Sequence, residues 1–384
     1  MGIKTVFLST YPPRACGIAT FTQDLVNELR AAGEIEPEIA AISDTDYAYP
    51  PEVKFTLEQQ KQNDYAEAAK KISGSGADLL MIEHEFGIYG GDWGNYVLDF
   101  AEAVKIPFLV TLHTVLPEPN QKQRNIVSEL ARKCDKIVTM AENSVDVLKN
   151  VYHAAPSKIA VVPHGVPERP LVPRDTLKKE EHLEGRFLVS TFGLLGPGKG
   201  LEYGIEAIAR VARSHPSVMY LVLGQTHPVI KRQEGEKYRE KLEQMVKDLG
   251  IEENVRFVNR YLTKDEIIRF LQISDLYMTP YLGKEQAVSG TLAYAVGYGR
   301  VIVSTPYVYA QEMLADGRGL FADFRSASSL ADQIIKMIER PEQKAIMEQK
   351  TREFGKNMMW SRVAERYRRL FQEAMEGHGK EPKK

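Results

Sequence analysis

The segment from Glu83 to Gly94 gathers acidic residues, a histidine, three aromatic rings and four glycines within twelve positions. Glycines let a backbone approach a ligand closely. Aromatic rings beside polar groups offer one apolar and one polar contact surface, which suits a sugar ring. The pattern therefore predicts a carbohydrate-binding loop at the end of a strand. A turn-rich loop with a capping histidine is the alternative.

Two further segments suit an anionic ligand. Residues 192–200 hold four glycines and Lys199, the composition of a phosphate-cradling loop. A Walker A motif is excluded because Gly200 follows the lysine, where Ser or Thr is required. Farther along, the Ser-Gly-Thr triplet 289–291 opens a helix predicted over 291–299, and helix N-termini attract anions. A glycine-rich turn with an exposed lysine is the alternative for the first segment.

Two smaller features lie near the ends of predicted strands. His113 lies in the strand predicted over 107–114, close to its carboxyl end, where an imidazole could donate to a substrate oxygen or shuttle a proton. Residues 10–20 form a small-residue loop that leads into a helix, and its N–H groups suit a phosphate or a hydroxyl-rich ligand. A structural histidine and an ordinary helix start are the alternatives.

The sequence offers few ligands for a metal ion. Asp44 and Asp46 have the spacing of a metal–diphosphate motif, but no second cluster of acidic residues or histidines accompanies them. Cys16 and Cys134 are too few for a zinc site or a disulfide framework. We therefore expect neither a metal nor a bound cofactor.

Strand-like and helix-like segments alternate along the first part of the chain. Phe21, Leu25 and Leu29 recur at four-residue spacing and predict a helix over 18–31. Several apolar runs lack alternation, which is typical of strands buried on both faces of a parallel sheet. The predicted strands are 5–9, 38–43, 77–85, 107–114, 136–142 and 158–164.

The same alternation restarts after residue 186. Thr263 and Glu266 form a capping box that predicts a helix over 264–273. The predicted strands of this second series are 187–193, 218–224, 255–259, 275–280, 301–305 and 319–323.

The chain is thus predicted to be an α/β protein with two doubly wound, Rossmann-like domains, residues 1–166 and 186–358. Residues 167–185 are rich in proline and charge, which favours a linker. Ligands of such sheets lie outside the carboxyl ends of the strands, and here we expect them in the cleft between the domains.

Composition and charge restrict the function further. Of the 384 residues, 43% are apolar and 27% charged, as in an ordinary globular protein. Lys plus Arg total 50 against 52 Asp plus Glu, whereas a general nucleic-acid binder carries a basic excess. No run approaches the ~20 apolar residues of a membrane helix, and the apolar stretch near the N-terminus is too short for a signal-peptide core. We expect a cytoplasmic protein that binds small molecules.

Taken in order, the strand ends resemble those of retaining glycosyltransferases of family 4, a family with the GT-B fold. The resemblance spans nearly the whole chain. Its motifs are Gly193 followed by Lys199-Gly200, the helix after 289–291 with 299–303 behind it, the Pro-His-Gly-Val run 163–166, and the final helix 359–376 with Trp360 and Tyr367, which in the family crosses back to the first domain.

The resemblance implies transfer of a hexosyl group from a nucleotide diphosphate sugar to a carbohydrate hydroxyl, with retention and without a metal. Lys199 and the N–H groups of Thr291 and Leu292 would stabilise the leaving diphosphate, and His113 would contact the donor sugar. The other implied donor contacts are Gly17, Gly193, Gly200, Gln286, Ser289, Gly290 and Tyr294. The implied acceptor contacts are His84, Glu85, Tyr89 and Trp93.

Some positions depart from the family pattern. Leu194 stands where the family usually has Arg, and Gln286 and Tyr294 stand where it usually has two Glu. Arg14, in a proline-stiffened loop, is our candidate for the missing diphosphate cation, and Arg260 is the competing one. A glycan phosphorylase on the same fold and a non-catalytic sugar-nucleotide-binding protein are the alternative functions.

Overall fold

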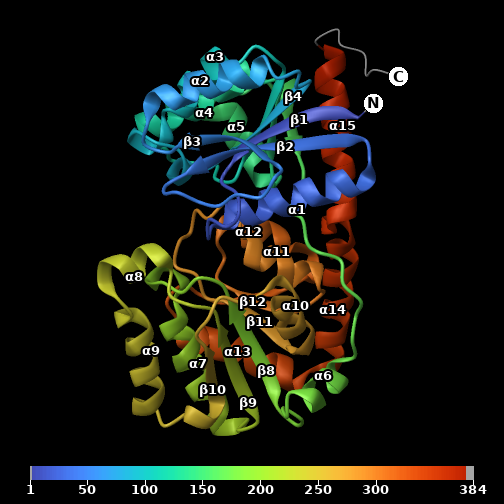
Figure 1. Cartoon of the computed structure of the whole chain (residues 1–384). Coiled ribbons are helices and arrows are strands. Elements are labelled where there is room, and N and C mark those ends of the chain that lie inside the picture. The colour runs from blue at the N-terminus through green and yellow to red at the C-terminus, as the bar shows by residue number, and fades with distance from the viewer. Residues whose placement is uncertain (1, 378–384) are drawn as a thin grey trace. The chain divides into compact units, whose positions relative to one another are not determined.

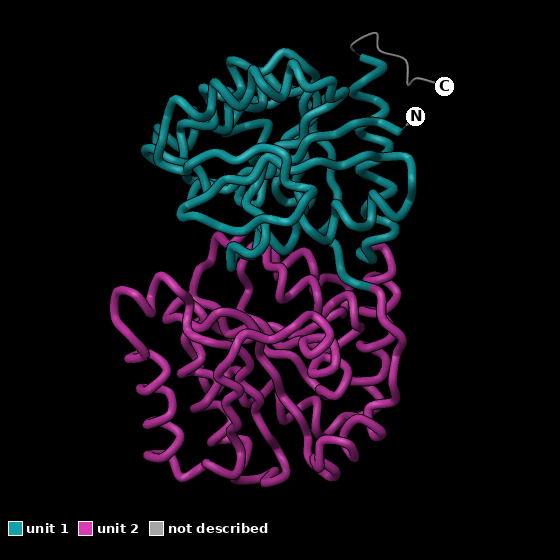
Figure 2. Tube along the Cα trace, viewed as in Figure 1, with its two compact units in different colours: residues 1–167, 358–384 teal, residues 168–357 magenta. Residues whose placement is uncertain are grey.

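The computed structural model describes residues 2–377, and the chain divides into two compact units (Figure 2). Unit 1 comprises residues 1–167 and 358–384, and unit 2 comprises residues 168–357. Each unit is built on one parallel sheet with helices between most successive strands (Figure 1). The prediction of two doubly wound α/β units is therefore confirmed.

Unit 1 holds a seven-stranded sheet in the order β3-β2-β1-β4-β5-β6-β7. Because β1 pairs with both β2 and β4, the strand order reverses between β1 and β4, and the loops that follow these two strands lie at a topological switch point. The strands are β1 (Ile3–Ser9), β2 (Ile35–Ser43), β3 (Val53–Glu58), β4 (Leu79–His84), β5 (Phe108–Leu112), β6 (Lys136–Thr139) and β7 (Ile159–Val161). The helices are α1 (Gly17–Ala32), α2 (Gln62–Ser73), α3 (Val97–Ala103), α4 (Gln121–Lys133), α5 (Asn143–Asn150) and α15 (Trp360–Gly377), with 3-10 turns η1 (Phe86–Ile88), η2 (Asp92–Gly94) and η3 (Pro156–Lys158).

Unit 2 repeats this plan with six strands in the order β10-β9-β8-β11-β12-β13. Its switch point lies between β8 and β11, which pair directly. The strands are β8 (Phe187–Phe192), β9 (Val218–Leu223), β10 (Val255–Val258), β11 (Leu276–Thr279), β12 (Val301–Ser304) and β13 (Leu320–Phe321). The helices are α6 (Arg174–Glu180), α7 (Leu201–Ser214), α8 (Pro228–Glu234), α9 (Lys237–Asp248), α10 (Lys264–Ile273), α11 (Gly290–Gly297), α12 (Val308–Met313), α13 (Ala327–Glu339) and α14 (Pro341–Gly355). The 3-10 turns are η4 (Pro197–Lys199), η5 (Glu252–Asn254), η6 (Ala315–Gly317) and η7 (Lys356–Met358), the last of which ends at the first residue of the returning part of unit 1.

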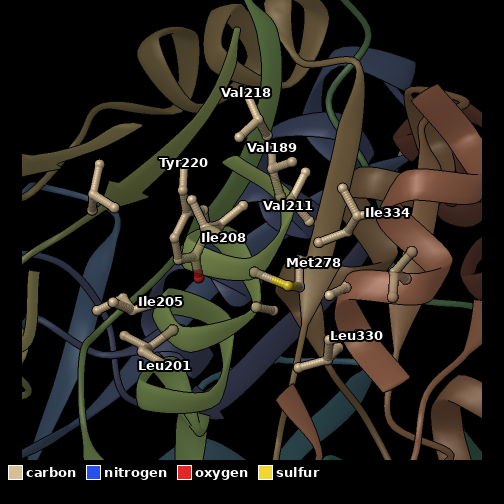
Figure 3. Close-up of a cluster of buried hydrophobic side chains, with 14 of the residues drawn as sticks. Val189, Leu201, Ile205, Ile208, Val211, Val218, Tyr220, Met278, Leu330 and Ile334 are labelled. Atoms are coloured by element: carbon tan, nitrogen blue, oxygen red, sulfur yellow. The ribbon is translucent and has the colours of Figure 1, made fainter. Parts of the chain in front are cut away.

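The core of unit 2 explains why its strands are uniformly apolar. Helices α7 and α13 pack side by side on the sheet, and their buried faces meet side chains from β8, β9 and β11 (Figure 3). Ile208 and Ile334 lie on the two helices, and Val189 and Met278 on the strands beneath them. Burial of this apolar surface stabilises the sheet and holds the loops at its carboxyl edge in fixed places.

The final helix, α15, belongs to unit 1 although unit 2 precedes it in the sequence. It packs against α1, as Figure 1 shows. Its Tyr367 hydroxyl hydrogen-bonds the Thr111 hydroxyl at 3.0 Å, and its Phe371 ring meets Phe7 edge-on, with the ring centroids 6.2 Å apart. The first unit is therefore assembled from two distant parts of the chain.

The segment 167–185, assigned to a linker by its composition, contains the helix α6. Leu177 on this helix is buried. The Lys178 ammonium lies 2.5 Å from the Asp275 carboxylate and donates to the Arg186 carbonyl at 2.7 Å. A buried, paired lysine thus fixes a segment whose prolines and charges suggested exposure. None of the helices among residues 2–377 has the length and apolarity needed to cross a bilayer.

Candidate functional site

In unit 2 the loop after β8, residues 193–200, is tied to its neighbours on both sides; we call it the glycine loop. Its Leu195 N–H donates to the Gln225 carbonyl at 2.9 Å, which joins it to the loop after β9. Its Gly198 carbonyl accepts from the Leu282 N–H at 3.0 Å, which joins it to the loop after β11. The glycine loop is therefore fixed at the switch point, where ligands of such sheets bind.

The close approach of these loops requires glycine at two positions. Gly200 has a φ of 62°, and a Cβ there would lie 2.2 Å from the Pro280 carbonyl oxygen. Gly224 has a φ of 130°, and a Cβ there would lie 2.0 Å from the Gly193 carbonyl oxygen. No other residue fits either position without moving the loops apart.

Lys199 lies on η4, in the glycine loop. Its ammonium lies 4.0 Å from the centroid of the Tyr281 ring, a cation–π distance. The nearby His227 has its pKa lowered by burial and by the charge of Lys199. The only strongly basic group of the loop is thus held against an aromatic face beside the switch point.

The start of α11 lies after the loop that follows β11. Ser289 caps this helix, because its hydroxyl accepts from the Leu292 N–H at 3.3 Å. The same hydroxyl hydrogen-bonds the Thr291 hydroxyl at 3.2 Å. The Leu292 N–H, expected to face a diphosphate, therefore has a hydrogen-bond partner within the helix cap.

Three other predicted donor residues have defined surroundings in unit 2. Gln286 donates through its side-chain amide to the Val288 carbonyl at 3.0 Å. The Tyr294 ring is buried, with its centroid 6.1 Å from that of Phe192. Arg260 forms a two-pronged ion pair with Glu266 on the surface, which lowers the pKa of that carboxyl to about 2. Arg260 is therefore paired with Glu266, a residue of the capping box of α10.

In unit 1 the site is built around His113, which directly follows β5. Its Nε2 lies 2.8 Å from the Glu83 carboxylate, and both side chains are buried. The pairing follows from the register, which places Glu83 on β4 opposite Thr111 on β5. Burial raises the pKa of the Glu83 carboxyl, and the hydrogen bond from His113 opposes this. Glu83 thus fixes the imidazole, a role that we did not predict although this carboxylate lies near the end of β4, after four apolar residues.

An aromatic cluster surrounds the other side of His113. The Phe21 ring, from α1, meets the imidazole edge-on with centroids 4.8 Å apart. Phe21 also meets His164 and the Trp360 ring, at 5.2 and 5.1 Å. Residues from the loop after β5, from α1, from the end of the first chain segment and from α15 therefore meet at one point of unit 1.

The segment 83–94 separates into buried and exposed residues. His84 is fully buried, stacks on Tyr89 with centroids 5.8 Å apart, and has its pKa lowered to about 3, mainly by burial. Tyr89 is buried as well and donates to the Glu83 carbonyl at 2.8 Å. The turn folds both side chains inward onto β4, and a contact of either with an acceptor stays a prediction.

The remaining predicted acceptor residues lie nearer the surface. Glu85 accepts from the Phe86 N–H at 2.9 Å and from the Thr114 hydroxyl at 2.5 Å. Trp93 is 51% exposed and has a φ of 55°, between Gly91 and Gly94, which also have positive φ. The backbone is therefore strained in a way that presents a large aromatic ring to solvent.

Arg14 has its partners within unit 1. Its guanidinium donates to the Ile42 carbonyl at 3.0 Å and to the Gln59 side chain at 2.9 Å. It also lies 3.6 Å from the Asp44 carboxylate. These contacts join the loop before α1, which begins at Gly17, to the end of β2, and a role toward a diphosphate stays a prediction.

The Asp44 carboxylate has a second partner besides Arg14, because it accepts a hydrogen bond from the Tyr47 hydroxyl at 2.9 Å. Among residues 2–377, no group of three or more His, Cys, Asp or Glu side chains is placed to hold a metal ion. The aspartate pair therefore has no companion ligands in the part of the chain that the structure describes.

Comparisons with known proteins agree with this architecture. Residues 15–169 match the model described as Glycosyltransferase Family 4, and residues 173–354 match that of Glycosyl transferases group 1. An uncharacterised glycosyltransferase of Methanocaldococcus jannaschii is 25% identical over 201 residues, which are 51% of this chain and 47% of that protein. The match thus spans about half the length of this curated relative.

Solved structures share the fold over nearly the whole chain. HepE of Anabaena, in complex with UDP and glucose, superposes with a TM-score of 0.75 at 15% identity and covers 97% of this chain and 100% of its own. Sucrose-phosphate synthase of Thermosynechococcus elongatus superposes with a TM-score of 0.77 at 15% identity, with the same coverage.

The chain has the GT-B fold of glycosyltransferases. It consists of two Rossmann-like units, and the second unit carries the glycine loop and the start of α11 at its switch point. With both halves of the sequence matched by family models, the chain belongs to the glycosyltransferases of family 4. The predicted family and the predicted GT-B fold are thereby confirmed.

Proposed function

We propose that the protein is a retaining, metal-independent glycosyltransferase that moves a hexosyl group from a nucleotide diphosphate sugar to an acceptor hydroxyl. The observation that carries the proposal is the placement of Lys199 and the start of α11 at the switch point of unit 2. An ammonium and a helix N-terminus are both stabilising toward a diphosphate.

The departing nucleoside diphosphate develops negative charge, which preorganised donors stabilise without reorganising. Lys199 supplies one full charge, and the first turn of α11 supplies the backbone N–H of Thr291, since that of Leu292 donates to the Ser289 hydroxyl. Gln286 offers both a donor and an acceptor to hydroxyls of the sugar. In this division of roles, Lys199 and α11 of unit 2 contact the diphosphate, and Arg14 of unit 1 stays the candidate for a further cation.

His113 acts on the sugar from unit 1. Its Nε2 is held by Glu83, so the ring has one orientation and its Nδ1 face is the one available for a substrate oxygen. Trp93 offers an exposed ring that suits stacking on a carbohydrate acceptor. Glu85, beside it in the sequence segment 83–94, provides a carboxylate for acceptor hydroxyls.

The proposal is tested with a panel of nucleotide sugars, starting with UDP-glucose because HepE was crystallised with UDP and glucose. Thermal shift identifies the donor, and NMR of the product then reports the anomeric configuration. We expect stabilisation by one donor and a product with the donor's configuration. Phosphate-dependent cleavage of a glycan would indicate the phosphorylase instead, and donor binding without turnover would indicate the non-catalytic binding protein.

The site itself is tested by Lys199→Ala. A charge-assisted hydrogen bond is worth roughly 1.5–3 kcal/mol, so turnover should fall by about ten- to a hundredfold. Lys241→Ala, an exposed lysine on α9, is the matched control and should keep full activity. Full activity in Lys199→Ala would remove this residue from the site.

A further inference from the structure

Tyr281 is a buried residue that contacts both of the anion-binding features of unit 2. It lies in the loop after β11, at a position to which neither the family pattern nor the sequence motifs assigned a role. The Lys199 ammonium lies 4.0 Å above the centroid of its ring. Its hydroxyl lies 2.8 Å from the Thr291 hydroxyl, at the first turn of α11.

Tyr281 is itself held in place from three directions. Its ring stacks on Tyr307, with centroids 5.5 Å apart and an interplanar angle of 16°. Its carbonyl accepts from the Thr305 hydroxyl at 2.6 Å. The next residue, Leu282, donates to the Gly198 carbonyl of the glycine loop at 3.0 Å. The ring is therefore a rigid support at the switch point.

The support has a consequence for the lysine. A lysine side chain has several rotatable bonds, and ordering it when a ligand binds costs conformational entropy. An ammonium already held over an aromatic face has lost much of that freedom before the ligand arrives. Leu194 supplies no second cation in the glycine loop. The affinity for a diphosphate therefore depends more strongly on where the Lys199 ammonium is held.

The hydroxyl of Tyr281 contacts the second anion-binding feature, the start of α11. It fixes the Thr291 hydroxyl, which in turn hydrogen-bonds the capping Ser289 hydroxyl at 3.2 Å. One side chain thus connects the charge of the glycine loop to the cap of α11. No other residue that the structure describes in unit 2 has both contacts.

We propose that Tyr281 is a positioning residue for the donor diphosphate: its ring holds the Lys199 ammonium, and its hydroxyl holds the first turn of α11. The proposal rests on the proposed function, because it takes the diphosphate to be the ligand of Lys199. It assigns to the loop after β11 a role in affinity that needs no direct contact with the ligand.

The test separates the ring from the hydroxyl. Tyr281→Leu removes the ring, and Tyr281→Phe keeps the ring but removes the hydroxyl. Binding of UDP, GDP and ADP is measured by calorimetry. Tyr281→Leu should weaken the nucleotide that binds best by about 3- to 30-fold, and Tyr281→Phe by less than about 3-fold.

A double-mutant cycle shows whether the effect passes through the lysine. In a Lys199→Ala background, Tyr281→Leu should weaken binding by less than about 2-fold, since the ring then has no ammonium to hold. An equal loss with and without Lys199, or no loss in Tyr281→Leu, overturns the proposal. Phe354→Leu removes the cation–π contact of Arg318 elsewhere in unit 2 and is the control, with affinity unchanged.

NMR gives a measurement that does not depend on nucleotide or on the folding of Tyr281→Leu. The ε-methylene protons of Lys199 should be shifted upfield by the ring in the wild-type protein and in Tyr281→Phe. An unshifted Lys199 signal in the wild-type protein overturns the proposal. Wild-type protein that binds none of the three nucleotides contradicts the proposed function instead, so the two failures are distinguishable.

Discussion

The pairing of His113 with Glu83 predicts a defect in turnover. His113→Ala should lower kcat by at least about tenfold, because the proposed function assigns this imidazole a contact with the donor sugar, and Glu83 holds it in one orientation. Nucleotide affinity should stay within about twofold, since the proposed diphosphate contacts belong to unit 2. Steady-state kinetics and calorimetry measure the two quantities.

Glu83→Gln is the matched variant for this pair. It keeps the size of the side chain and replaces the carboxyl by an amide, so kcat should fall between the values of the wild-type protein and His113→Ala. Unchanged turnover in His113→Ala, or a large loss of thermal stability in its place, would assign the pair to the core of unit 1.

His84 predicts a dependence of stability on pH. Burial lowers its pKa to about 3, whereas an unfolded histidine titrates near 6.5. Above pH ~6.5 the imidazole is neutral in the folded and in the unfolded protein, so it does not lower the free energy of unfolding. As the pH falls toward 3, His84 becomes protonated in the unfolded chain but stays neutral in the folded protein, so the free energy of unfolding falls.

Between pH 7 and pH 5 this loss amounts to about 2 kcal/mol, at ~1.4 kcal/mol for each pKa unit. Urea unfolding at the two pH values measures it, and His84→Phe should lose about 2 kcal/mol less than the wild-type protein over the same interval. His153→Asn, at an exposed histidine, should behave as the wild type does. Equal losses in His84→Phe and the wild type would mean that His84 is charged in the folded protein.

Some features of the candidate site could be predicted from the sequence, and others could not. The glycine loop and the cap of α11 depend on neighbours in sequence, and both were found from local composition. The inward orientation of His84 and Arg14 depends on Tyr89 and Gln59, which no spacing rule connects to them. The His84 contact lies within one turn and the Arg14 contact joins two distant segments, and only the folded structure shows that both side chains point inward.

At the scale of elements, Gly165 marks the contact between the end of the first chain segment and α15. A Cβ at this position would lie 2.2 Å from the Trp360 ring. Gly165→Ala should therefore destabilise the protein by about 1–3 kcal/mol, because a buried ring must move. Urea unfolding measures the loss.

Gly87→Ala is the matched control in the same unit, since nothing lies within 4 Å of its Cβ. Its stability should stay within about 0.5 kcal/mol of the wild-type value. Because Trp360 meets Phe21, and Phe21 meets His113, Gly165→Ala should also reduce turnover. A variant as stable as the control would show that α15 adjusts without cost.

The elements themselves were predicted where their signals are local. The capping box of Thr263 and Glu266 gave the bounds of α10, residues 264–273, as the structure has them. β3 was not predicted because it is no continuous apolar run: its exposed residues alternate with Val53, Phe55 and Leu57, which are partly or fully buried, as befits the edge of the sheet. α6 was missed because its buried lysine depends on Asp275, almost a hundred residues away.

For the whole molecule we predict that activity survives EDTA. Lys199 and the first turn of α11 supply the positive charge that a metal supplies in other transferases. Transfer is assayed with and without chelator, and then with Mn²⁺ added back. Activity that disappears with EDTA and returns with Mn²⁺ would contradict the prediction and implicate Asp44 and Asp46.

The return of α15 to unit 1 sets the order in which the protein is completed on the ribosome. Strands β1 and β5 emerge early, but Tyr367 and Phe371, which cover Thr111 and Phe7, are made only after all of unit 2. At ~5–20 residues per second, that interval is on the order of 10–40 s. Unit 2, being continuous in sequence, has its full set of contacts first, and the earlier-synthesised unit remains an unfinished, apolar-faced intermediate until translation reaches the last helix.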